Sequence, residues 1–177
     1  MNAELPSSRK RLRAERYDYA QPAGYLVTIC VHGRRKLLGE ITEEHASLSP
    51  AGRMVEEHWL AVAMRYPFVE LDSYAVMPNH FHGIITLQPV DGEMPPKTLS
   101  QIIGAFKSMT TIAYKRAMDD EMWTPIGEHL WQRSFHDRII RGDRHLDRLR
   151  DYVEANGANW PWDAENPDRL AALSGVH

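Results

Sequence analysis

The sequence lacks several features that mark extracellular and membrane proteins. It has a single cysteine, Cys30, so neither an internal disulfide nor a multi-thiolate metal site can form within the chain. No apolar run approaches the roughly 20 residues that a membrane-spanning helix needs. The polar and basic N-terminus also lacks the apolar segment of a secretory signal. We therefore expect a cytoplasmic protein that has no membrane partner.

Length and aromatic content indicate one folded domain. With 177 residues the chain is too short for a (β/α)8 barrel, which needs roughly 250. Five Trp and seven Tyr are sufficient to build a core, which argues against wholesale disorder. We expect a basic N-terminal arm over residues 1–20, one domain over residues 21–162 and a C-terminal tail over residues 163–177.

Charge is unevenly distributed along the chain. The formal net charge is −3, but basic side chains collect within residues 1–36 and 133–150, and acidic ones collect between residues 40 and 72. A chain of this kind can carry a local anion-binding face although it is acidic in total.

Residue patterns predict strands that alternate with helices. Ser49 followed by Pro50 indicates the start of a helix, whereas Asp143 and Gly157 indicate the cap and the end of the last helix. The expected strands cover residues 24–31, 69–77, 80–87 and part of 130–141, and the expected helices cover residues 50–66, 98–118 and 143–156. This order, with a hairpin at its centre, predicts an α+β fold in which helices pack on a mostly antiparallel sheet.

Two histidines lie two residues apart in the expected strand 80–87. Because side chains alternate along a strand, the imidazoles of His80 and His82 point to one face, about 7 Å apart along the strand, while Phe81 points to the other. Two imidazoles on a rigid strand can share one divalent cation. His80 and His82 are therefore candidate metal ligands.

The last expected helix carries a candidate nucleophile. Its apolar stripe consists of Leu146, Leu149 and Val153. Tyr152 and Asn156 lie beside this stripe, one helical turn apart, and project along the same edge. If the helix packs near the histidines, a phenol, an amide oxygen and two imidazoles converge on one metal, and a phenol can attack a phosphorus atom that a cation activates. Tyr114, on the preceding helix, is the competing nucleophile.

At these residues the chain resembles the single-tyrosine HUH transposases, and among them the REP-associated tyrosine transposases. The resemblance extends over about residues 9–162 and is carried, in order, by RLRAERYDYAQPAGYLVTICVHGRRKLLGEI, YAVMPNHFHGIITL, GAFKSMTT, LWQRSFHDRIIR and DYVEAN. It implies a ferredoxin-like antiparallel sheet of the HUH endonuclease type. It also implies a DNA transposase that uses Mg²⁺ or Mn²⁺ to cleave and rejoin single-stranded DNA at short palindromic hairpins, through a transient 5′-phosphotyrosine.

The resemblance also implies a role for individual residues. His80 and His82 match the family's metal ligands, Tyr152 matches the nucleophile, and Asn156 matches the polar residue that completes the metal shell. This chain has Asn156-Gly157 where the family often has Asn-Pro, which affects the end of the helix and the direction of the Asn156 side chain. Basic residues are expected to contact DNA phosphates. They are Arg9, Lys10, Arg11, Arg13, Arg16, Arg138 and Arg141.

Other interpretations of the same residues stay open at this point. A protein of this fold can recognise palindromic DNA without cleaving it, as a catalytically silent or regulatory module. An unrelated small metalloprotein that uses the two histidines would bind Zn²⁺ and ignore DNA. Trp131 and Phe135 are either core residues or platforms for unpaired bases, and the part played by His136 is undecided. The protein is expected to be a monomer or a homodimer, which the sequence does not decide.

Overall fold

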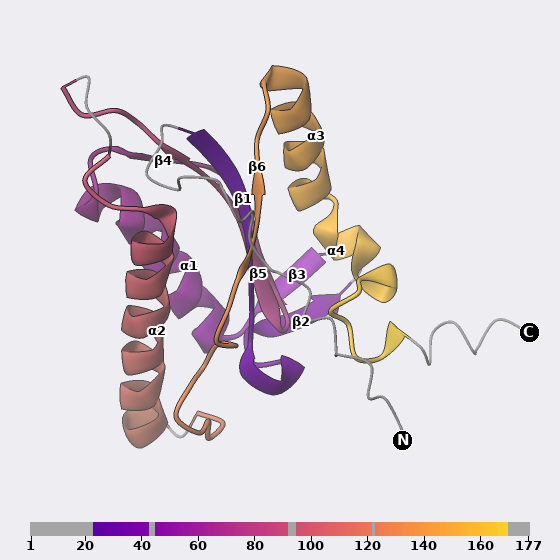
Figure 1. Cartoon of the computed structure of the whole chain (residues 1–177). Coiled ribbons are helices and arrows are strands. Elements are labelled where there is room, and N and C mark those ends of the chain that lie inside the picture. The colour runs from indigo at the N-terminus through magenta and orange to yellow at the C-terminus, as the bar shows by residue number, and fades with distance from the viewer. Residues whose placement is uncertain (1–22, 43–44, 92–94, 122, 170–177) are drawn as a thin grey trace, which may run out of the picture.

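The computed structural model describes residues 23–42, 45–91, 95–121 and 123–169. A four-stranded sheet lies at its centre, with strand order β4-β5-β1-β6, and every neighbouring pair is antiparallel (Figure 1). The strands are β1 (Ala23–Cys30), β4 (Val69–Met77), β5 (His80–Leu87) and β6 (His136–Ile139). With helices after β1 and β5, this is the β-α-β-β-α-β arrangement of ferredoxin-like folds, and it confirms the expected fold class.

Helices cover both faces of the sheet (Figure 1). On one face lie α1 (Pro50–Arg65) and α2 (Leu99–Glu121), and on the other lie α3 (Asp143–Glu154) and the short α4 (Asn156–Asn159). Two 3₁₀ turns are η1 (His32–Arg34) and η2 (Trp160–Trp162), and a separate hairpin pairs β2 (Gly39–Thr42) with β3 (His45–Leu48). Among the described residues, none of the helices combines the length and the apolar character of a membrane span.

The main core fills the space between the sheet and the helices α1 and α2. Trp59 of α1 packs against Phe81 of β5, with ring centroids 4.7 Å apart, and against Phe106 of α2 at 5.5 Å. Gly83 explains how Trp59 comes this close to β5, because a Cβ at that position would lie 2.5 Å from the indole. Trp131 is also buried here, in the same cluster as Phe106. Phe81 therefore anchors β5 from one face, while the histidines on either side of it face α3.

A smaller core fixes α3 to the other face of the sheet. Leu149 and Val153 of α3 are buried against Leu26 of β1 and Ile84 of β5. The guanidinium of Arg150 adds a forked contact, because its Nε and Nη2 donate to the Asp72 carboxylate on β4 at 2.6–3.2 Å. These contacts determine the rotation of α3 about its axis, and they direct the side chain of Tyr152 along the sheet.

The structure differs from the sequence expectations in three places. Asp143 does not cap α3: Gly142 occupies the cap position, and Asp143 is the first helical residue. The last helix also does not stop at Gly157, since it breaks at Ala155 and α4 continues the chain. The side chain of Asn156 supplies the reason, because its Nδ2 donates to the carbonyls of Tyr152 and Val153 and satisfies the end of α3. Neither strand of the β2-β3 hairpin was expected.

Candidate active site and metal centre

His82 belongs to a cross-strand row of side chains on the α3 face, and His80 lies beside it. In the sheet register His82 pairs with Thr28 of β1, and Thr28 pairs on its other side with His136 of β6. His80 lies two residues before His82 on the same face, and the Nε2 atoms of the two rings are 3.0 Å apart. The rings meet edge to face, with centroids 4.6 Å apart. The alternation of side chains along β5 therefore brings both imidazoles together, as the sequence predicts.

Burial keeps both imidazoles neutral. It lowers the pKa of His80 to about 4. It also lowers the pKa of His82, to about 3, with a further contribution from the neighbouring His80. A neutral imidazole has one ring nitrogen with a free lone pair, which is the form that binds a metal.

The hydrogen bonds of Asn79 assign the tautomer of His80. The Asn79 Nδ2 donates to the carbonyls of Arg34 and Glu165, at 3.1 and 2.7 Å, so its Oδ1 faces the ring of His80. That oxygen can only accept, and it lies 2.9 Å from the His80 Nδ1. Nδ1 therefore carries the proton of His80, and Nε2 has the lone pair. Asn79 is fully buried, and sequence reasoning missed it although it stands next to His80.

His82 is positioned by a hydroxyl that can either donate or accept a hydrogen bond. The Oγ1 of Thr28 lies 2.8 Å from the His82 Nδ1. When the proton of His82 is on Nε2, this nitrogen donates to the lone pair of the His80 Nε2, and the Thr28 hydroxyl donates to the His82 Nδ1. If the proton of His82 moves to Nδ1, the Thr28 hydroxyl accepts it and both Nε2 atoms have free lone pairs. Thr28 therefore supports the resting tautomer as well as the metal-binding one.

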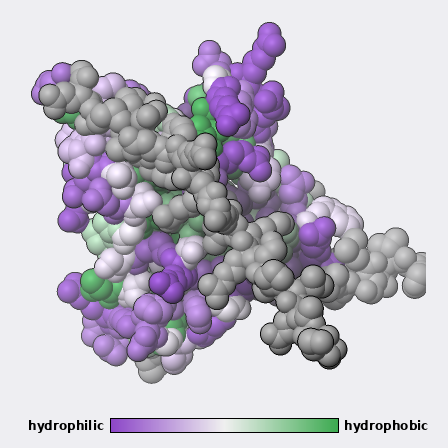
Figure 2. All heavy atoms as spheres, viewed as in Figure 1, coloured by the Kyte–Doolittle hydropathy of each residue, from purple (hydrophilic) through white to green (hydrophobic). Residues whose placement is uncertain are grey.

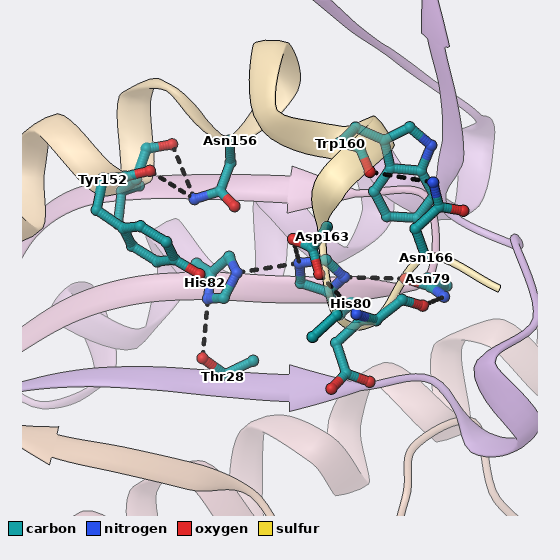
Figure 3. A network of polar contacts seen from close by, with 12 residues as sticks. Thr28, Asn79, His80, His82, Tyr152, Asn156, Trp160, Asp163 and Asn166 are labelled. Carbon is teal, nitrogen blue, oxygen red and sulfur yellow. Dashed lines mark hydrogen bonds and ion pairs between the residues drawn. The ribbon is translucent and has the colours of Figure 1, made fainter. Parts of the chain in front are cut away.

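An aspartate completes a possible metal site. The Oδ2 of Asp163 lies 3.7 Å from the His80 Nε2, and the ligand atoms of His80, His82 and Asp163 are all within 4.8 Å of one another (Figure 3). This donor set suits a divalent cation: two nitrogens each about 2.1 Å from a metal and at right angles would be about 3.0 Å apart, and the Nε2 atoms are 3.0 Å apart. Sequence reasoning placed Asp163 in a tail, because nothing near it in the sequence indicates this contact.

Tyr152 lies next to the His pair. It belongs to the last turn of α3, and its ring meets that of His82 edge to face with centroids 5.4 Å apart (Figure 3). Burial raises the pKa of Tyr152 above its ordinary value, the carboxylates of Asp163 and Glu165 raise it further, and Arg138 lowers it. The resting hydroxyl is therefore protonated, and a phenolate there needs positive charge in addition to Arg138.

These residues line one open pocket of about 440 Å³ between the sheet and the segment that follows α3. Tyr152, Asn156, His82 and Asp163 all contribute to its wall, as does the exposed ring of His136. The structure therefore brings together the tyrosine and the histidine pair that the sequence predicts, with Asn156 in the same pocket. Since the Asn156 Nδ2 donates to the backbone of α3, the oxygen is the atom of this amide that can act as a ligand.

Tyr114, the competing tyrosine, lies elsewhere. Its side chain is only 2% exposed on α2, the helix that covers the opposite face of the sheet. Its hydroxyl donates to the carbonyl of Thr124 at 2.9 Å, and its ring packs on Trp123. Cys30 is no alternative nucleophile either, because burial raises the pKa of its thiol to about 12.

The basic residues that were expected to contact DNA divide into an exposed pair at β6 and the N-terminal arm, and Arg150, which was not among them, is paired within the protein. Arg138 and Arg141 are exposed at β6 and just after it, and Arg138 acts electrostatically on Tyr152. Arg150, one of the arginines near the tyrosine, is instead paired with Asp72. The expected contacts of the N-terminal arm lie outside the described residues. They are Arg9, Lys10, Arg11, Arg13 and Arg16.

The outer side of α3 adds further positive charge. Arg144 and Arg148, one turn apart, are both exposed there. Figure 2 shows hydrophilic side chains over the outside of α3 and apolar ones where it meets the body of the molecule. Trp131 and Phe135, in contrast, are buried in the main core and offer no platform for bases.

Comparisons with known proteins show what this chain is similar to. A protein of uncharacterized function from Haemophilus influenzae Rd is 29% identical over 171 residues, which are 88% of this chain and 91% of that protein. The structure of a REP-associated tyrosine transposase bound to a REP hairpin superposes with a TM-score of 0.61 at 20% identity, covering 85% of this chain and 76% of that one.

A second solved structure, a putative transposase from Deinococcus radiodurans R1, superposes with a TM-score of 0.50 at 16% identity, covering 80% of this chain and 95% of that one. At such identities the two structures show the fold. The family itself is shown by sequence, since the profile of the family "Transposase IS200 like" matches residues 23–156, which include β1, both histidines, Tyr152 and Asn156. The chain therefore belongs to the IS200-like transposase family.

Proposed function

We propose that this transposase cleaves and rejoins single-stranded DNA at short palindromic hairpins, with Tyr152 as the nucleophile. The observation that carries the proposal is the position of a half-exposed tyrosine against the buried, neutral imidazole of His82, with which it lines one open pocket, while the neutral imidazole of His80 lies directly behind His82. The structural neighbour described as bound to a REP hairpin supports DNA of that kind as the substrate. The protein would act in the cytoplasm, on DNA of the nucleoid.

We propose His80 and His82 as the nitrogen ligands of a divalent cation, with Asn156 and Asp163 as the oxygen ligands. Imidazole nitrogen together with amide and carboxylate oxygen is a donor set that Mn²⁺ accepts, and the oxygens also suit Mg²⁺. Once bound, the cation would polarise a phosphate oxygen and stabilise the charge that develops in the transition state. Asn79 and Thr28 orient the two rings through their Nδ1 atoms.

The residues of this chain have separate roles in the proposed step. The Tyr152 oxygen attacks the scissile phosphorus and loses its proton, the bond from phosphorus to O3′ breaks, and the departing oxygen takes up a proton as a free 3′-OH. The product is a 5′-phosphotyrosine, which the 3′-OH of another strand later resolves by the reverse reaction. Arg138, whose charge favours the phenolate, and Arg141 beyond it would hold the neighbouring phosphates. The expected N-terminal arm contacts would act on the hairpin itself.

A denaturing gel tests the proposal. Hairpin DNA from the organism's own genome, with single-stranded flanks, is incubated with the protein and Mn²⁺, and a covalent complex migrates slowly on the gel. We expect the complex with the wild type and with Tyr114→Phe, its loss with Tyr152→Phe, and its loss on addition of a chelator. Loss in Tyr114→Phe alone would assign the nucleophile to the other tyrosine.

The second candidate function is a catalytically silent or regulatory module that recognises palindromic DNA. The exposed arginines Arg144 and Arg148 on the outer side of α3 favour it, because they can bind DNA phosphates whether or not Tyr152 reacts. DNA binding by the wild type without any covalent complex, over a range of hairpins and metal ions, would establish this module in place of the enzyme.

A further inference from the structure

In addition to the ring of Tyr152, the pocket wall contains a second large aromatic ring, which has no part in the proposed reaction. Trp162, the last residue of η2, lines the pocket together with His82 and Tyr152, and it is 56% exposed. Trp160, at the other end of the same turn, is buried and stacks on His80 with centroids 6.0 Å apart and planes at 28°. The Trp-Pro-Trp turn thus presents one indole to the histidines and the other to the open pocket.

We propose that Trp162 is a stacking platform for an unpaired nucleobase next to the scissile phosphate. This inference rests on the proposed function. An exposed aromatic ring in a concave site is the usual means by which a protein holds single-stranded nucleic acid, since every base has a π face. The pocket, of about 440 Å³, lies within the roughly 300–1,000 Å³ range of sites that hold small organic ligands.

The charges around Trp162 favour a base over a phosphate. Asp163 follows it in the chain, Glu165 comes two residues later, and both carboxylates line the pocket. Both carboxylates also act electrostatically on Tyr152, so a phosphate in this pocket needs the proposed cation to offset their charge. The neutral base of the same nucleotide needs no such compensation, and the exposed ring of Trp162 offers it a surface in the same pocket.

The backbone on both sides of Trp162 is held by the rest of the protein. The Asn166 Nδ2 donates to the carbonyl of Trp160 at 3.0 Å, and the Asn79 Nδ2 donates to the carbonyl of Glu165 at 2.7 Å. Arg34 adds an ion pair to the Glu165 carboxylate at 3.2 Å. A segment anchored on both sides in this way loses little backbone freedom when a base stacks on its exposed ring. The turn follows the family match, which ends at residue 156, so this subsite is supplied by a segment outside that match.

A double-mutant cycle that combines a protein variant with DNA variants tests the inference. Trp162→Ala is compared with the wild type on a cleavable hairpin substrate and on versions in which single nucleotides flanking the scissile phosphate are abasic. The measured quantity is the Kd, in a Tyr152→Phe background so that no cleavage occurs. Stacking on one base is worth about a 5- to 150-fold change in affinity. On the intact DNA we expect Trp162→Ala to bind more weakly than the protein with Trp162, by this factor. On the DNA that lacks the stacked base, we expect the two proteins to bind with equal affinity.

Three controls separate the outcomes. Trp162→Phe should recover part of the affinity, and Trp162→Ala should unfold at the wild-type temperature, because the ring is half exposed. Saturating DNA should restore the rate of complex formation by Trp162→Ala in the presence of an intact Tyr152. The subsite would be overturned if the effect of Trp162→Ala and the effect of the missing base were additive at every abasic position. Unchanged affinity of Trp162→Ala for the intact DNA would overturn it as well. A wild type that neither binds DNA nor forms the covalent complex would instead refute the proposed function itself.

Discussion

Replacement of Asn79 by alanine should weaken metal binding as well as the fold. Its amide makes three hydrogen bonds in a fully buried position: two donated to the carbonyls of Arg34 and Glu165, and one accepted from the His80 Nδ1. The first two hold the segment that carries Asp163, and the third holds the tautomer and the orientation of His80. One side chain therefore supports a metal ligand on each side of the site.

The loss of stability follows from these three contacts. Each hydrogen bond contributes about 0.5–1.5 kcal/mol, and carbonyls that are left without a partner add to the loss. We therefore expect Asn79→Ala to lower the free energy of unfolding by about 3 kcal/mol. For a domain of this size, this corresponds to a fall in Tm of about 6–12 °C.

The aspartate variant separates stability from metal binding. Asn79→Asp loses the two donated bonds, so it is destabilised at least as much as Asn79→Ala. It keeps an oxygen that accepts from the His80 Nδ1, and a carboxylate in that position makes the imidazole a more basic ligand. Loss of a partner of this kind lowers metal affinity by about 10- to 100-fold. We expect that loss in Asn79→Ala and a smaller loss in Asn79→Asp, which keeps the contact to His80 but not the bond that holds the segment of Asp163.

Two measurements on each folded variant test this prediction. Urea unfolding gives the stability, and electron paramagnetic resonance of free Mn²⁺ during a titration gives the affinity. Equal losses of Mn²⁺ affinity in the two variants would show that Asn79 acts only through the fold. Wild-type affinity in Asn79→Ala would refute the argument that its oxygen orients His80 for a metal.

Three further predictions concern the support of the site. The hydrogen bond from Arg150 lowers the pKa of Asp72. This contact therefore stabilises the protein fully above the unfolded-state pKa of about 3.9, and the stabilisation is lost as pH falls through the lower folded-state pKa. The urea unfolding midpoints of the wild type and of Asp72→Asn should converge at acid pH, and a constant difference between them would contradict this. Gly83→Ala places a Cβ 2.5 Å from the ring of Trp59. It should lower the free energy of unfolding in urea by about 1–3 kcal/mol, whereas an unchanged midpoint would show that the ring moves freely. Tyr114→Phe loses one buried hydrogen bond and should unfold about 1 kcal/mol more easily with its covalent complex intact; loss of that complex at full stability would count against a structural role.

The parts of the site that could be predicted are those with a local signal. Alternation along β5 is enough to place His80 and His82 on one face, and helical spacing is enough to place Tyr152 and Asn156 one turn apart. The helix start at Ser49 was confirmed, with the serine hydroxyl accepting from the Gly52 amide at 3.1 Å. In each case the residues that interact lie within a turn or a strand of one another.

The parts that were missed depend on contacts between distant segments. Asp163 reaches His80 from 83 positions further along the chain, and no periodicity of its own neighbourhood indicates this. Asn79 stands beside His80, but its importance comes from the carbonyls of Arg34 and Glu165, which only the folded chain brings together. Strand β3 is only four residues long, HASL, and lacks β-branched side chains.

The expected boundaries of the arm, the domain and the tail stay predictions. The described part of the expected tail nevertheless contacts the rest of the molecule, through Asp163 at His80 and through Glu165 at Arg34. A chain truncated after residue 162 would lose these contacts, so activity measurements should use the full chain.

The polarity of the covalent bond tests the central claim most directly. The same hairpin DNA is labelled either at its 3′ end or at its 5′ end, allowed to react with Mn²⁺, and resolved on a denaturing gel, and the peptide that carries the nucleotide is then sequenced by mass spectrometry. We expect the 3′ label to move with the protein, the 5′-labelled fragment to be released with a free 3′-OH, and the nucleotide to lie on Tyr152. A 5′ label on the protein, or a nucleotide on any other residue, would contradict the central claim.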